Sequence, residues 1–142
     1  MANITITGEY VLKRNEGFYE YLVAQGITAD KAKATDLVRP VMKISVEGED
    51  IIFSTEFGSS NISSVLKLKQ EVEERIGLDM IVKSYTEIDG NRITIHSVGP
   101  NGEVGRRNFE FKENEMIMTL SSDKPNIPEA KRYYNRMPSH LS

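Results

Sequence analysis

An arginine and a tyrosine near the end of the chain have the types and spacing to hold an anion. Arg132 and Tyr134 lie in the run Ala130 to Met137, whose pattern is typical of a β-strand. Because strand side chains alternate between two faces, both would point to the same side. On a solvent face the pair is ordinary surface. Inside a barrel the guanidinium needs a buried acceptor, because an unpaired interior charge is costly, and a ligand carboxylate would supply it.

Length and composition exclude several classes of protein. The 142 residues fit one domain, and 18 basic against 21 acidic residues give a net charge of -3, which argues against a general nucleic-acid binder. Without cysteine there is no disulfide, thiolate metal site or cysteine nucleophile. The N-terminus lacks the features of a secretory signal, and no apolar stretch could span a bilayer. We therefore expect a soluble cytoplasmic protein.

Enzyme chemistry has little support in the sequence. The two histidines, His96 and His140, have neither metal-ligand spacing nor a nucleophile near them. The acidic cluster Glu71, Glu73 and Glu74 resembles a pair of carboxylates, but the first two share one strand face and indicate a solvated outer surface. No glycine-rich loop opens a helix, so no phosphate cradle is expected. We predict a protein without catalysis, metal or cofactor.

Two short helices are expected near the N-terminus. The range Asn15–Gln25 places Phe18, Tyr21 and Leu22 at helical spacing, and a glycine then ends the helix. Thr28 can cap a second helix, which must end near residue 39 because Pro40 follows. These two segments predict a helix-turn-helix that depends on packing against something larger.

The rest of the chain reads as strands separated by turns. Turn signals recur roughly every 8 to 12 residues, the spacing of an antiparallel sandwich or barrel. With a first strand around 6–12 and a last strand over 130–137, we count about ten strands, more than the roughly eight whose side chains can fill a barrel. A cavity is therefore expected. Buried candidates on the alternating runs are Ile51, Phe53, Ile93, Ile95, Phe109 and Met118.

Several stretches together resemble the intracellular lipid-binding proteins, the fatty-acid-binding and retinoid-binding family. The stretches that carry the resemblance are Gly8–Leu12, Asn15–Gly26, Arg39–Val41, Thr55–Phe57 with Asn61–Ser63, Gln70–Glu74 and Arg132–Tyr134. Each is weak alone, but their order and spacing cover nearly the whole chain. The resemblance implies an all-β fold, a ten-stranded antiparallel up-and-down barrel (β-clam) with a helix-turn-helix lid. We expect residues 1–142 to form this single domain, and the sequence from Pro138 onward indicates a frayed tail at 138–142.

The resemblance also implies a function: reversible, non-covalent binding and transport of long-chain fatty acids or a related hydrophobic carboxylate by a monomer. Arg132 and Tyr134 would hold the carboxylate, with Arg107 as a second cation. Phe109 stands where the family has its inner arginine on the eighth strand, and Arg107 would share the inward face with Phe109 and Phe111. The residues expected at the cavity or portal are Phe18, Tyr21, Leu22, Phe53, Phe57, Phe109 and Met118.

Alternatives remain at this point. The barrel could bind a retinoid or another lipid, or could be a protein-interaction barrel filled by its own side chains. In a rival register of the last strand, Lys131 and Tyr133 point inward and Arg132 lies in solvent. Lys31 and Lys33 on the second helix could contact anionic membranes, or could be plain soluble surface.

Overall fold

Strands dominate the fold, and two short helices close one end of it. The computed structural model describes residues 6–76 and 80–138, without the side chains of Phe57, Ile76 and Met80. The strands in this part of the chain are β1 (Gly8–Glu16), β2 (Val41–Glu47), β3 (Asp50–Phe57), β4 (Ser60–Lys67), β5 (Glu71–Ile76), β6 (Met80–Asp89), β7 (Arg92–Val98), β8 (Val104–Phe111), β9 (Glu115–Ser122) and β10 (Ala130–Arg136). The helices are α1 (Phe18–Ala24) and α2 (Ala29–Leu37).

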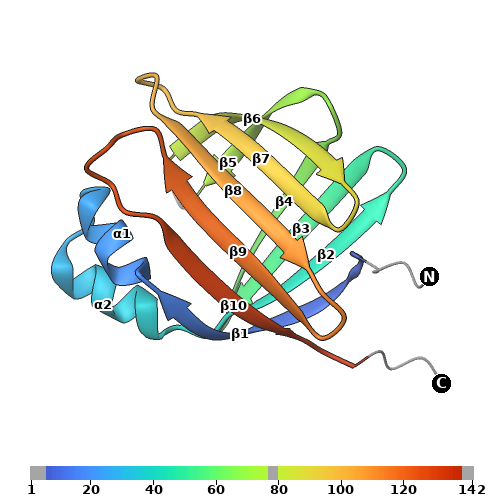
Figure 1. The fold of residues 1–142 in the computed structure, drawn as a ribbon, viewed down its shortest axis with the longest axis horizontal. Coiled ribbons are helices and arrows are strands. Elements are labelled where there is room, and N and C mark those ends of the chain that lie inside the picture. The colour runs from blue at the N-terminus through green and yellow to red at the C-terminus, as the bar shows by residue number, and fades with distance from the viewer. Residues whose placement is uncertain (1–5, 77–79, 139–142) are drawn as a thin grey trace.

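All ten strands form one antiparallel sheet that curls into a nearly closed barrel (Figure 1). Strands that follow each other in sequence pair, except β4 and β5, and β1 pairs with β10, so that β4 and β5 are the two ends of the sheet. Across that gap an isolated bridge joins Leu68 to Thr86, and the Lys69 amide donates to the Thr86 carbonyl at 2.8 Å. The predicted all-β barrel with a helical lid is confirmed.

The first helix starts later than the sequence predicted. Asn15 and Glu16 were expected in the helix, but they continue β1 and pair with Arg132 and Lys131 of β10. Gly17 then turns the chain into α1 with a φ of 69°, and a Cβ at this position would lie 3.1 Å from a backbone carbonyl oxygen. Glycine suits both conditions. The helical spacing in this stretch could not reveal that the two residues before Gly17 pair with a distant strand.

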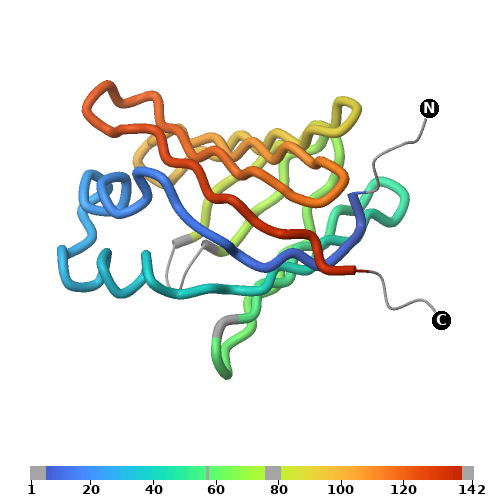
Figure 2. The backbone as a smooth tube through the Cα atoms, turned by 60° about the horizontal axis from the view of Figure 1, so that its bottom comes forward, coloured from blue at the N-terminus to red at the C-terminus, as the bar shows by residue number. Residues whose placement is uncertain are grey.

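Both helices lie at the end of the barrel opposite the start of β1 and the end of β10 (Figures 1 and 2). Helix α1 buries Phe18 and Leu22 in a small cluster that also contains Ala32 of α2 and Ala130 of β10. The lid is thus attached to the last strand, beside the arginine singled out above. No helix in the described part of the chain is long and apolar enough to cross a membrane.

The main core lies within the barrel and is separate from the cluster under the lid. It consists of inward side chains from most of the strands, and all six residues predicted as buried belong to it. Its members are Tyr10, Leu12, Met42, Ile44, Ile51, Phe53, Leu66, Ile93, Ile95, Phe109, Phe111, Met116, Met118 and Tyr134. A cavity lined by Tyr21 and Leu22 of α1 lies beside the lid.

Candidate functional site

Arg132 points into the barrel from the middle of the sheet. Its Cα partners are Asn15 on β1 and Met118 on β9, and its Nε donates a hydrogen bond to Asn15 Oδ1 at 3.0 Å. The guanidinium carbon lies 4.1 Å from the centre of the Phe18 ring. Burial lowers the pKa of Arg132, because the charged form loses its hydration. An inward cation is therefore held by an amide oxygen and an aromatic face.

The neighbouring residues on β10 fix this register. Lys131 is exposed, and the hydroxyl of Tyr133 donates to Glu16 Oε1 at 2.8 Å on the outer surface. The rival register, which would have turned Lys131 and Tyr133 inward, is therefore not the one observed.

Tyr134 lies on the inward face with Arg132. It is 1% exposed, and its ring centre is 5.9 Å from the guanidinium carbon of Arg132. Its Oη is buried and has no hydrogen-bond partner in the described part of the chain. Burial also raises the pKa of the phenol, so that at neutral pH the hydroxyl keeps the proton it can donate. A buried hydroxyl without a partner carries a desolvation penalty that a bound acceptor would remove.

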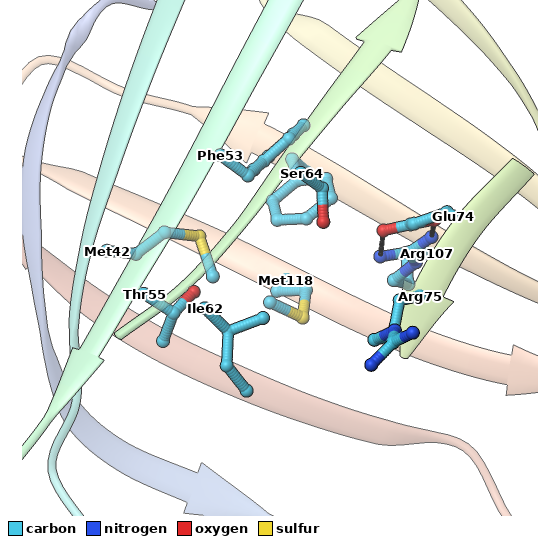
Figure 3. Close-up of a pocket in the computed structure, with 10 residues that line it drawn as sticks. Met42, Phe53, Thr55, Ile62, Ser64, Glu74, Arg75, Arg107 and Met118 are labelled. Carbon is cyan, nitrogen blue, oxygen red and sulfur yellow. Dashed lines mark hydrogen bonds and ion pairs between the residues drawn. The ribbon is translucent and has the colours of Figure 1, made fainter. Parts of the chain in front are cut away.

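Arg107 also points inward, but it already has a carboxylate partner. Its Nη1 donates to Glu74 Oε2 at 3.0 Å, and its Nη2 donates to Glu74 Oε1 in a two-pronged ion pair (Figure 3). The side chain of Glu74 is 5% exposed and that of Arg107 is 22% exposed. Nη2 also donates to Ser97 Oγ at 3.2 Å.

Among the described residues, one cavity lies inside the barrel and a larger one lies beside the lid. The smaller cavity, about 150 Å³, is lined by three of the predicted cavity residues, Phe53, Phe109 and Met118, and by both partners of the buried ion pair. The larger, about 350 Å³, lies between α1 and the β7–β8 and β9–β10 connections and contains Tyr21 and Leu22. The larger volume is in the range of small-molecule sites, roughly 300 to 1,000 Å³.

The remaining predicted residues lie elsewhere. Phe18 packs beneath Arg132 rather than at either cavity wall. The side chain of Phe57 lies outside the described residues, so its portal role stays a prediction. Lys31 and Lys33 are exposed on α2, and His96 lies on the outer face of the barrel, with Nε2 3.6 Å from Glu87 Oε1.

Sequence reasoning missed Glu74 as an interior residue. Glu71 and Glu73 are exposed, as their shared strand face indicates, but Glu74 is on the opposite face and is buried. The alternation along β5 was the available signal. Arg75, which also lines the smaller cavity, was missed as well.

Comparisons with known proteins agree with this architecture. Fatty acid-binding protein 2 of Manduca sexta is 30% identical over 126 residues, which cover 88% of this chain and 93% of that protein. The chain belongs to the fatty-acid-binding protein family. No protein-family model matches the sequence.

Two further proteins are similar to this chain over almost their whole length. Sodium/calcium exchanger regulatory protein 1 of Doryteuthis pealeii is 28% identical over 134 residues, 93% of this chain and 96% of that protein. The solved structure of the fatty acid-binding protein from brain tissue of Drosophila melanogaster superposes with a TM-score of 0.80 at 26% identity, over 92% of this chain and 99% of the other.

Proposed function

We propose that this protein binds a long-chain fatty acid, or a related hydrophobic carboxylate, reversibly and carries it through the cytoplasm as a monomer, without a chemical step. The observation that carries the proposal is the pair Arg132 and Tyr134. One is a desolvated cation, and the other is a buried hydroxyl without a partner in the described part of the chain. The names of the relatives from Manduca sexta and Drosophila melanogaster, both fatty acid-binding proteins, support the same ligand class.

The two ends of such a ligand would contribute differently. Each methylene that leaves water contributes about 0.8 kcal/mol before the costs of ordering. A carboxylate at Arg132 would add a charge-assisted hydrogen bond, and the hydroxyl of Tyr134 could donate a second one. Met118, the Cα partner of Arg132 on β9, lines the smaller cavity together with Phe53 and Phe109, so the head group would be adjacent to a partly apolar space.

The test compares a fatty acid with its methyl ester by titration calorimetry. Arg132→Ala should weaken binding of the acid by about 1.5 to 3 kcal/mol, the usual range for a hydrogen bond to a charged group. The ester, which lacks the charge, should lose much less. Lys131→Ala is the matched control, because it removes an exposed cation from the same strand. Equal losses for acid and ester, or no loss for either, would contradict the assignment of the anchor.

A further inference from the structure

Four side chains from neighbouring strands form a polar network inside the barrel. Glu74 on β5 accepts from Ser84 Oγ of β6 at 2.8 Å and from both terminal nitrogens of Arg107 on β8. Ser84 Oγ lies 2.8 Å from Ser97 Oγ of β7, and Ser97 accepts from Arg107 Nη2 at 3.2 Å. Glu74 and Arg107 line the smaller cavity and Ser97 lines the larger one, so the network lies between the two.

Counting protons fixes the direction of each bond. A serine hydroxyl has one proton, and Ser84 gives its own to Glu74. The bond between the serines must therefore be donated by Ser97 to Ser84. Both hydroxyl protons are then committed, and three of the five N–H groups of Arg107 are used. Each serine proton thus has an acceptor inside the network, whereas two of the five N–H groups of Arg107 take no part in it.

The two inward arginines therefore differ in charge balance. The charge of Arg107 is cancelled by Glu74, whereas no carboxylate in the described part of the chain lies within ion-pair distance of Arg132. A ligand carboxylate near Arg107 would also meet the negative charge of Glu74 in a medium of low polarity, where like charges repel strongly. At Arg132 the carboxylate of Asp36 acts through its charge without an ion pair, because it accepts a hydrogen bond from Asn15 instead, so repulsion there is weaker.

We propose that Glu74 determines head-group selectivity: by neutralising Arg107 it reserves Arg132 for a single ligand carboxylate and makes the Arg107 region suited to an uncharged chain. The preferred ligands are then monocarboxylic lipids, and amphiphiles that carry a charge at both ends are disfavoured. This inference rests on the proposed function, because it assumes that the barrel binds a hydrophobic acid. It adds a residue that selects among such acids.

A rescue experiment tests the inference. Arg132→Ala should lose affinity for hexadecanoate, and adding Glu74→Gln should restore about tenfold of it, because Arg107 is then free to make a charge-assisted hydrogen bond. The methyl ester should bind the single and the double variant alike, which shows that the cavity is intact. Glu71→Gln in the Arg132→Ala background is the matched control, because Glu71 is exposed on the outer face of the same strand. Arg75, which also lines the smaller cavity, is kept in every variant, so that its charge is the same in all the comparisons.

The possible outcomes separate the inference from the proposed function. If wild type binds neither acid nor ester, the proposed function fails. If Arg132→Ala loses the acid and Glu74→Gln restores nothing while the ester still binds, the function stands and the role of Glu74 is overturned. If Arg132→Ala binds the acid as tightly as wild type does, Arg132 does not hold the ligand carboxylate, and the inference is overturned.

If the double variant no longer binds the ester, the Glu74→Gln variant alone tests the role of Glu74. Glu74→Gln should then bind hexadecanedioate about tenfold more tightly than wild type does, while hexadecanoate changes by about twofold or less. The second carboxylate gains Arg107 as a partner, whereas the single carboxylate already has Arg132. An unchanged ratio between the two acids would refute the proposal.

Discussion

The guanidinium of Arg132 lies 4.1 Å from the centre of the Phe18 ring, so the inward cation of β10 touches the first residue of helix α1. Asn15 extends this link: it accepts from Arg132 Nε at 3.0 Å and donates to Asp36 Oδ1 of α2 at 3.0 Å. Both helices of the lid are thus connected to the proposed anchor. A change in either helix should affect binding of the head group as well as entry of the ligand.

Replacing Phe18 by leucine should show whether its ring supports the head-group site or only packs the lid. Leucine keeps most of the apolar burial but removes the aromatic face, which is worth about 0.5 to 2 kcal/mol to a nearby cation. We expect weaker binding of a fatty acid by an amount in that range, with little change for its methyl ester, when both are measured by calorimetry. Tyr19→Leu on the same helix is the control. An equal loss for both ligands would mean that Phe18 serves only to pack the lid.

Alkaline pH should destabilise the ligand-free protein through its buried tyrosines. Burial raises the pKa of Tyr10 to about 12 and also raises that of Tyr134, against an ordinary value near 10. Between these values the unfolded chain has released protons that the folded chain still holds. The stabilising contribution is therefore complete below pH 10 and is lost as the pH rises toward the folded values.

Urea unfolding between pH 8 and 11 checks this prediction. The free energy of unfolding of wild type should fall above about pH 10, and Tyr134→Phe should reduce the fall because it removes one of the titrating groups. At pH 8 the same substitution should cost little, since the hydroxyl it removes has no partner in the described part of the chain. Tyr19→Phe is the comparison variant. An identical pH dependence in wild type and Tyr134→Phe would contradict the argument.

The fold was largely predictable because its signals are local. Turn residues such as Gly48, Gly58 and Gly90 have positive φ values and lie in the β2–β3, β3–β4 and β6–β7 connections. Period-two alternation then assigned the buried face of each strand. The start of α1 was not predictable in this way, because Asn15 and Glu16 are held in β1 by pairing with residues more than a hundred positions away.

The candidate site was only half predictable for the same reason. Alternation placed Arg132, Tyr134 and Arg107 on inward faces, which the structure agrees with. It could not tell which arginine has an acidic partner, because Glu74 and Arg107 are 33 positions apart and meet across the barrel interior. Whether an interior charge is free or neutralised is a tertiary property.

Lys31 and Lys33 give a prediction about delivery of the ligand. Both are exposed on α2, where a membrane surface could reach them. Transfer of a fluorescent fatty acid to anionic vesicles should slow when both become glutamate, and raised salt should slow transfer by wild type. Lys83 and Lys131, exposed on the strands, provide the control pair for the same double replacement. Equal transfer rates for wild type and the α2 variant would remove this role.

Arg132 should lower the stability of the ligand-free protein while it serves binding. Its charge is desolvated, as the lowered pKa indicates, and it has one hydrogen bond, to Asn15, with no carboxylate of the described residues at ion-pair distance. Replacing a poorly compensated buried charge by an apolar side chain of similar length is often stabilising, by about 1 kcal/mol or more. Arg132→Met should therefore raise the free energy of unfolding in urea.

The same variant should bind a fatty acid more weakly, so that stability and affinity change in opposite directions. Lys131→Met, at the exposed neighbouring position, should change neither by more than about 0.5 kcal/mol. A less stable Arg132→Met would show that the contacts with Phe18 and Asn15 outweigh the desolvation of the cation. Arg132 would then be a structural residue of the lid, and the case for a ligand carboxylate as its missing partner would lose its physical basis.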